Sequence, residues 1–345
     1  MTTYAIGVDL GGTNLRIAAV DNAGKMLEKI TTSTEVARGR DVVIDDMCAA
    51  IQQVVARRRG SGELAGIGIG VPGIIEMQTG MLRESPNLPG WHNYPVRDEI
   101  ERRLQTTVVL ENDANAAALG EKWTGAAAAV DDMCMFTLGT GVGGGVVMQG
   151  RIWHGMTGMA GELGHINVEP EGHPCGCGSR GCLEQYASAT AVKRMANEVI
   201  AAGTAPQLAL AVKADPEFTA KVIYELAMRG DAPAREIFRR VGNALGIVIA
   251  DMVNIFNFPM YVIGGGVASA WDAFAPAMME TVRRNSFVYR ATNPAATPAT
   301  APAEPSRTTV VTHALLGSDA GLIGASRLPM VAKEPDAATP EFRTA

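Results

Sequence analysis

The chain has 345 residues, of which 47% are hydrophobic and 19% are charged, so it can bury substantial cores, and its length favours about two domains. The formal net charge of -6 argues against a nucleic-acid partner, since such surfaces are basic. The longest apolar region, residues 245–263, is interrupted by polar residues and a proline, which indicates a buried helix and strand, not a membrane span. A strand is expected to begin at Tyr4, with no signal peptide before it, and the chain has only five cysteines. A cytoplasmic protein without a nucleic-acid or membrane partner is therefore expected.

Two segments, residues 6–25 and 135–151, follow one pattern of strand, glycine turn, strand, polar turn and third strand. They lie about half the chain apart, and such spacing favours a repeat of whole domains. The repeat predicts two related domains, each opening with three antiparallel strands whose first turn faces a shared cleft.

Helices and strands alternate between and after these segments. Helices are predicted at 41–59, 96–104, 115–123, 190–202, 216–229, 232–253, from 271 onwards and from 318 onwards, and strands at 64–71, 107–111, 259–263 and 308–312. The Pro/Ala/Thr-rich residues 293–306 are expected to form an irregular exposed connection, and residues 329–345 a disordered tail.

One short region gathers residues that bind metals. His165, Cys175, Cys177 and Cys182 lie close together in the sequence, with His173 as a second histidine that could replace His165. Cys175 and Cys177 are too close in sequence for an easy disulfide, and a reducing compartment favours metal ligands. Zn²⁺ in structural sites takes four protein ligands from Cys and His, so these residues predict a closed zinc site.

Three glycine-rich turns follow apolar strands, at residues 11–13, 139–141 and 264–266. Glycines let the backbone approach a ligand and point successive N–H groups at an anion. Any one turn is explained by a simple hairpin, but three together favour a nucleoside triphosphate site. Gly139, Gly141 and Gly144 also match the dinucleotide fingerprint, but a strand is predicted where that fingerprint needs a helix. No P-loop motif is present.

Two carboxylates lie beside these features. Asp9 is expected at the end of a buried strand next to the first turn, where it could hold Mg²⁺ or simply cap the turn. Asp113 follows the predicted strand 107–111 and opens a helix, so it could cap that helix. Because ligands in such sheets bind beyond the strand ends, Asp113 could also be the base that takes a proton from a substrate hydroxyl.

Together these motifs resemble those of the ROK family of bacterial sugar kinases and sugar-responsive repressors. The resemblance rests on the Asp9 turn, residues 111–115, the Gly139 turn, residues 161–165, the cysteine signature 175–184 and the turn 264–266. It implies an α/β protein with the actin-like ATPase (ribonuclease H-like) fold and two domains around a central cleft. The smaller domain would comprise residues 1–118 and 315–328, and the larger one residues 119–314.

The resemblance also implies roles for individual residues. Asp113 would be the catalytic base. Sugar hydroxyls would be held by Asn112, Asp113, Glu162, His165 and Glu184. ATP phosphates and Mg²⁺ would be held by Asp9, Gly11, Gly12, Thr13, Asn14, Thr140 and Gly141, with Gly265 near the adenosine. The ligands of a structural zinc would be His165, Cys175, Cys177 and Cys182, which favours His165 over His173.

Within the family the chain is most similar to the branch that phosphorylates glucose at the 6-hydroxyl. Kinases for fructose, mannose, allose, N-acetylglucosamine or N-acetylmannosamine remain alternatives, and so do polyphosphate or ADP as phosphoryl donors. A repressor would need a DNA-reading domain before the first strand, for which no room is expected, and a catalytically inactive sugar sensor is opposed by Asp113. The resemblance favours a homodimer or a dimer of dimers.

Overall fold

The structure is a computed structural model that describes residues 3–85, 87–214, 218–293 and 308–332. The chain forms two compact units. The first unit comprises Met1–Trp123, His154–Met159 and Asp319–Ala345, and the second comprises Thr124–Trp153 and Ala160–Ser318. The predicted domain division did not anticipate that a short segment, His154–Met159, joins the first unit.

The first unit contains a five-stranded mixed sheet in the order β3-β2-β1-β4-β7. Its strands are β1 (Thr3–Leu10), β2 (Asn14–Asp21), β3 (Met26–Ser33), β4 (Glu63–Val71) and β7 (Val109–Asn112). The first three strands pair antiparallel, whereas β4 runs parallel to β1, and β7 runs parallel to β4. A separate hairpin is formed by β5 (Ile74–Glu76) and β6 (Met81–Glu84).

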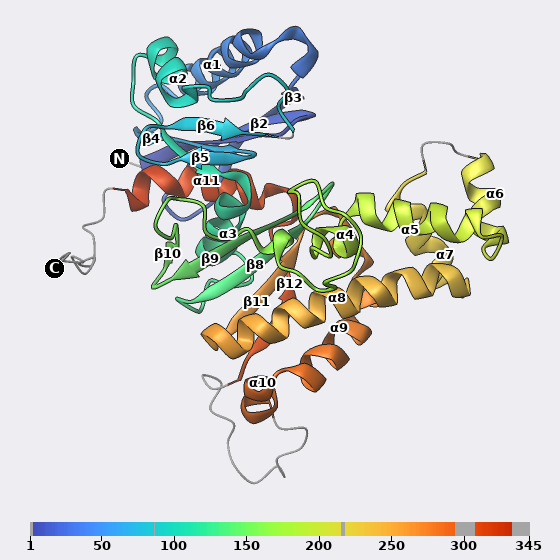
Figure 1. The fold of residues 1–345 in the computed structure, drawn as a ribbon. Helices are drawn as coiled ribbons and strands as arrows, with labels where there is room; N and C mark the ends of the chain where they lie inside the picture. Colours follow the sequence, from blue (N-terminus) through green and yellow to red (C-terminus); the bar gives the residue numbers. More distant parts are fainter. Residues whose placement is uncertain (1–2, 86, 215–217, 294–307, 333–345) are drawn as a thin grey trace. The chain divides into compact units, whose positions relative to one another are not determined.

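Helices lie on both faces of this sheet. The helices α1 (Arg40–Arg57) and α2 (Val96–Leu104) lie on one face and α11 (Ala320–Val331) lies on the other, as Figure 1 shows. The helix α3 (Asp113–Thr124) directly follows β7. Glycines allow α11 to approach the sheet closely, since a Cβ at Gly68 would lie 1.9 Å from the carbonyl oxygen of Ala325.

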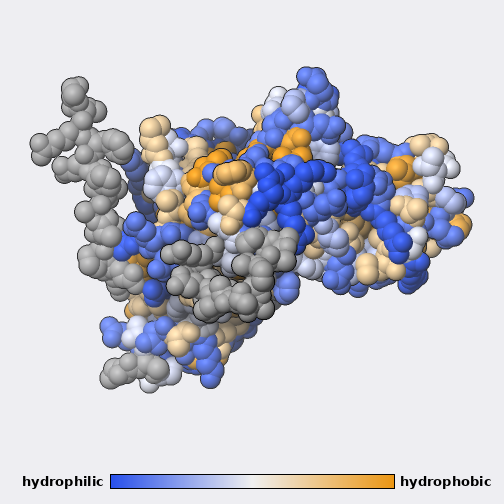
Figure 2. Space-filling view, turned by 90° about the horizontal axis from the view of Figure 1, so that it is seen from below, coloured by the Kyte–Doolittle hydropathy of each residue, from blue (hydrophilic) through white to orange (hydrophobic). Residues whose placement is uncertain are grey.

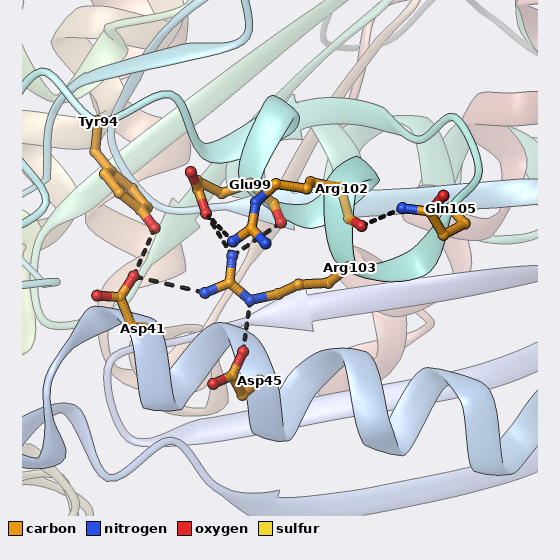
Figure 3. Close-up of polar contacts among 7 residues, drawn as sticks. All are labelled: Asp41, Asp45, Tyr94, Glu99, Arg102, Arg103 and Gln105. Carbon is orange, nitrogen blue, oxygen red and sulfur yellow. Dashed lines mark hydrogen bonds and ion pairs between the residues drawn. The ribbon is translucent and has the colours of Figure 1, made fainter.

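A network of charged side chains joins α1 to α2 (Figure 3). The Arg103 guanidinium donates to Asp45 Oδ1 and to Glu99 Oε2, both at 2.5 Å, and lies 3.6 Å from Asp41 Oδ1. The Tyr94 hydroxyl donates to the same Asp41 oxygen at 3.2 Å. Burial and this hydrogen bond raise the pKa of Tyr94 to about 12. The Arg103 side chain is 15% exposed, and its contacts connect α1 to α2. The apolar faces of both helices pack on the sheet.

The second unit repeats the sheet of the first. Its order is β10-β9-β8-β11-β12. The strands are β8 (Met133–Leu138), β9 (Val142–Met148), β10 (Arg151–Ile152), β11 (Met260–Gly264) and β12 (Val310–His313). Again three antiparallel strands are followed by two parallel ones. The predicted repeat of two antiparallel three-stranded openings is therefore confirmed.

Helices make up most of the rest of the second unit. They are α4 (Glu184–Ala187), α5 (Ala189–Ala201), α6 (Pro206–Ala214), α7 (Ala220–Met228), α8 (Ala232–Phe256), α9 (Trp271–Asn285) and α10 (Phe287–Thr292). The Asp231 side chain caps α8 by accepting from the N–H of Ala234. α8 and α9 approach closely at Gly242, where a Cβ would lie 2.2 Å from the carbonyl oxygen of Phe274. Figure 1 shows α9 running beside α8.

Several sequence predictions need correction. The hairpin β5–β6 and the helices α6 and α10 were not predicted, and the helix expected from residue 115 begins at Asp113. The expected tail begins too early, because α11 continues to Val331. Residues 294–306 and 333–345 lie outside the described residues.

The visible face in Figure 2 is mostly hydrophilic with smaller hydrophobic areas. No helix in the described part of the chain is long and apolar enough to cross a membrane.

Candidate active site

The predicted catalytic segment lies where β7 passes into α3. Asn112 Oδ1 accepts the backbone N–H groups of Ala114 at 2.9 Å and Asn115 at 3.2 Å, so Asn112 is the residue that caps α3. Its Nδ2 donates to the carbonyl oxygen of Gly73 at 3.1 Å. Asp113 is the first residue of the helix, and its Oδ1 lies 2.9 Å from the Ala114 nitrogen. The cap that was the alternative role of Asp113 is therefore supplied by its neighbour.

The buried carboxylate of Glu111 forms hydrogen bonds with residues of this segment. Glu111 is 2% exposed, and its Oε1 accepts from the backbone N–H of Asn112 at 2.9 Å and from Asn115 Nδ2 at 3.0 Å. Its Oε2 lies 2.6 Å from Nε2 of His154, which comes from the segment His154–Met159. Burial acts to lower the pKa of His154, but the hydrogen bond and the charge of Glu111 outweigh it and raise the pKa. Sequence reasoning did not consider His154, which no motif marks.

The first glycine turn connects β1 to β2. The Gly11 N–H donates to the Asn14 carbonyl at 2.9 Å, and the Thr34 hydroxyl donates to the Gly11 carbonyl at 2.6 Å. Thr13 and Asn14 are exposed. A Cβ at Gly12 would lie 2.7 Å from the carbonyl oxygen of Asn87, so this position needs glycine for space.

Asp9 lies beside this turn within a group of four charges. Its Oδ2 is 3.4 Å from Nη1 of Arg16, and Lys29 forms a second ion pair nearby, with Asp319 at the start of α11. Burial raises the pKa of Asp9, Arg16 and Lys29 oppose that shift, and Asp319 adds to it. Two carboxylates close together beside this turn are oxygen ligands of the kind that Mg²⁺ takes. Sequence reasoning found Asp9 but missed Asp319, which is far away in the chain.

The second glycine turn is joined directly to a predicted sugar-binding residue. Within the turn, the Gly139 N–H donates to the Gly141 carbonyl at 2.9 Å. Glu184 Oε2 accepts the Val142 N–H at 3.0 Å, and the Thr190 hydroxyl donates to the Thr140 carbonyl at 2.8 Å. A Cβ at Gly141 would lie only 2.3 Å from Glu184 Oε2. A hydrogen bond and a close packing contact, both made by Glu184, therefore join the turn to the start of α4.

A pocket of about 750 Å³ opens beside Thr140. Its lining residues are Thr140, Ala189, Thr190, Lys193, Arg194, Asn197, Glu198 and Ala201. Lys193, Arg194 and Glu198 give the lining one net positive charge, with Arg194 paired to Glu198 at 2.5 Å, and this charge suits an anionic ligand. In the third glycine turn, Gly265 has a φ of 87°, and a Cβ there would lie 2.5 Å from the Leu138 carbonyl oxygen, so only glycine fits.

The structure brings the four predicted metal ligands together. One ligand atom from each of His165, Cys175, Cys177 and Cys182 lies within 4.8 Å of the others. Cys175 Sγ is 3.7 Å from His165 Nδ1, and Cys177 Sγ is 3.7 Å from Cys182 Sγ. A tetrahedron with Zn–S bonds of about 2.3 Å has sulfur–sulfur edges of about 3.8 Å, so the donor set fits zinc.

The two histidines of this region differ in their contacts. Nδ1 of His173 lies 2.9 Å from the Pro174 carbonyl oxygen, outside the ligand cluster. His165 turns Nδ1 toward the cysteines, and its Nε2 lies 3.9 Å from Oε2 of Glu162. The second ring nitrogen of His165 and the Glu162 carboxylate, which is 52% exposed, thus lie together as a polar pair that suits hydroxyl groups.

Known proteins resemble the chain over nearly its whole length. The model of the ROK family matches residues 5–331. The chain is 38% identical to a glucokinase of Halalkalibacterium halodurans, with 93% of each chain covered. It is 42% identical to a glucokinase of Thermotoga maritima, over 80% of this chain and 86% of that one. It is also 31% identical to a xylose repressor of Caldicellulosiruptor bescii, over 82% of this chain and 71% of that one.

One similar solved structure contains bound glucose and AMPPNP. The chain superposes with a TM-score of 0.75 on a ROK family glucokinase from Streptomyces griseus in complex with glucose and AMPPNP. The two are 33% identical, and the match covers 94% of this chain and 98% of that one.

Proposed function

The chain belongs to the ROK family and has the actin-like ATPase fold predicted from its sequence, and we propose that it transfers the γ-phosphoryl group of ATP to the 6-hydroxyl of D-glucose. The observation that carries this proposal is the similarity to a glucokinase with glucose and AMPPNP bound, over almost the whole chain. The local geometry supports it, because Asp113 begins the helix after β7, the glycine turns follow strands, and His165 Nε2 lies 3.9 Å from Glu162 Oε2 as a polar pair.

Asp113 is proposed as the base. Its carboxylate takes the proton of the 6-hydroxyl while that oxygen forms a bond to the γ-phosphorus, and the bond from phosphorus to the ADP oxygen breaks. A positioned base of this kind contributes about 10²–10⁴ in rate. The cap of α3 is held by Asn112, so proton transfer at Asp113 leaves the helix end intact.

The glycine turns are proposed to hold the ATP phosphates through backbone N–H groups. Asp9, with Asp319 near it, would hold Mg²⁺, and the charge that the ion would supply is positive charge against the phosphate oxygens. The pocket beside Thr140, with Lys193 and Arg194 in its wall, offers an anionic nucleotide a second group of contacts.

Hydroxyl recognition is assigned to Asn112, Glu162, His165 and Glu184. The His165/Cys175/Cys177/Cys182 cluster is compatible with structural zinc, whose role would be to fix the ring of His165. With Nδ1 committed to that cluster, Nε2 remains for a sugar hydroxyl. A site that hydrogen-bonds hydroxyls rejects an analogue lacking one, since buried polar groups are then left unpaired.

The test is kcat/KM for each sugar at saturating Mg-ATP, and D-glucose should exceed N-acetylglucosamine, N-acetylmannosamine and fructose. If another hexose clearly exceeds glucose, the substrate assignment fails while the kinase assignment stands. If none of the sugars is phosphorylated, both fail. Replacing ATP by polyphosphate or ADP in the same assay tests the donor.

Three further properties are proposed. The chain would form a homodimer or a dimer of dimers, and would act in the cytoplasm. The domain division at residues 118 and 314 is also proposed, with the short segment His154–Met159 joined to the first unit. Light scattering of the purified protein, with and without glucose, checks the first of these.

A further inference from the structure

The segment His154–Met159 is anchored on the first unit, although the residues before and after it belong to the second. One anchor is the contact of His154 with Glu111. The other is Gly158, which has a φ of 88° and where a Cβ would lie 2.7 Å from Cγ of Met77. Between the anchors Met156 is 97% exposed, so the segment is held at its ends and not along its length.

The Glu111 carboxylate links His154 to the residues on both sides of Asp113. One of its oxygens accepts from the Asn112 backbone and from the Asn115 side chain, and the other faces His154. Asn112 in turn holds the N–H groups of Ala114 and Asn115. Asp113 is therefore bracketed on both sides by residues whose position depends on the Glu111 carboxylate.

We propose that His154 is a positioning residue for the catalytic step: by holding Oε2 of Glu111 it fixes the segment that presents Asp113. The inference rests on the proposed function, because it takes Asp113 as the base. His154 acts through Glu111 and has no part in binding sugar or nucleotide.

The burial of the two partners sets the size of the effect. Glu111 is 2% exposed, so its Oε2 has little access to solvent while His154 is present. The His154 side chain is 38% exposed, so removing it lets water reach that oxygen. Water restores a hydrogen bond but does not fix the direction of the carboxylate. A misplacement of about 1 Å near reacting groups can cost about 100-fold in rate, and a partial loss of order should cost about tenfold.

The experiment compares His154→Ala and His154→Gln with His92→Ala. His92 is an exposed histidine of the same unit whose side chain contacts its neighbour Asn93, so it serves as the matched control. His154→Ala should lower kcat about tenfold while KM for glucose and ATP stays within about twofold. His154→Gln retains an N–H donor and should recover most of the lost kcat. His92→Ala should behave as the wild type.

Two further measurements separate positioning from general destabilisation. In an Asp113→Asn background, His154→Ala should lower kcat by less than about twofold, because residues that act as one unit are not additive. Hydrogen exchange of the free protein should be about tenfold faster for the amides of residues 112–115 in His154→Ala, and unchanged in His92→Ala.

The inference is overturned if His154→Ala keeps wild-type kcat, if KM rises as much as kcat falls, or if exchange at residues 112–115 is unchanged. If the wild type phosphorylates no sugar, the proposed function fails. The exchange measurement then still decides whether His154 orders this segment.

Discussion

Replacing Gly141 by alanine should separate the glycine turn from Glu184. The new Cβ would lie 2.3 Å from Glu184 Oε2 and 3.3 Å from its Cδ. Since Cβ contacts under 3.0 Å essentially never occur, the carboxylate must move by about 0.7 Å or more, a shift of the size that costs enzymes activity. That movement breaks or lengthens the 3.0 Å hydrogen bond from the Val142 N–H.

The expected loss follows from this single contact. A hydrogen bond to a charged group contributes about 1.5–3 kcal/mol, which corresponds to roughly 10- to 150-fold in an equilibrium or rate. We expect kcat/KM for glucose to fall about 10- to 100-fold, because Glu184 is proposed to bind a sugar hydroxyl, whereas KM for ATP should not rise, because the Val142 N–H is then released for a phosphate oxygen. Steady-state kinetics with each substrate varied in turn gives both values.

The control is Gly176→Ala, because a Cβ at Gly176 meets nothing within 4 Å. It should retain the wild-type constants within about twofold, and circular dichroism should show both variants folded. If Gly141→Ala retains kcat/KM for glucose within about threefold, Glu184 does not depend on the turn and the reasoning is wrong.

The remaining predictions concern the base, the metal and the first unit's charged network. Asp113→Asn should fold and bind glucose but lose about 10² or more in kcat with KM little changed, whereas near-normal turnover would exclude it as the base. Cys177→Ala should lose bound zinc by elemental analysis and weaken glucose binding; a zinc-free protein with full activity would exclude the structural role. Arg103→Met should lower the free energy of unfolding in urea at pH 7 by about 1 kcal/mol, against less than about 0.5 kcal/mol for the exposed Arg239→Met. Hydrogen bonds from Arg102 and Arg103 lower the pKa of Glu99, so their stabilisation is present above its ordinary pKa of 4.5 and is lost as the pH falls through the lowered pKa; the difference between wild type and Arg103→Met should shrink in acid.

Much of the fold could be predicted because both units repeat the same local signals. The openings at residues 6–25 and 135–151 each carry alternating apolar residues broken by glycine turns, and their sheets have the same strand order. The hairpin β5–β6 was missed because its strands are three and four residues long, too short for a period to be read. The tail was expected to begin at residue 329 because the composition becomes polar and proline-rich, yet α11 includes Pro329 and continues to Val331.

The site was predictable where chemistry is local in sequence. The cysteines and His165 lie close together in the chain, so their residue types alone indicated a metal site, and the structure brings their ligand atoms together. Contacts between distant segments left no such signal. Glu111 meets His154 across 43 positions, and Lys29 meets Asp319 across 290, so the pairing of each depends on the tertiary fold.

The two glycine turns that are proposed to bind phosphate need glycine for different reasons, and the difference bears on how sugar and ATP binding would be coupled. At Gly12 the position of a Cβ is blocked by the backbone carbonyl of Asn87, which cannot rotate away as a side chain can. At Gly141 it is taken by the Glu184 carboxylate, which can rotate. A sugar that draws Glu184 toward itself would weaken its hold on the Val142 N–H and release that donor for a phosphate oxygen. Among the described residues of the two turns, the Val142 N–H is a donor held by a proposed sugar-binding side chain, so we expect coupling between sugar and ATP to arise at the second turn.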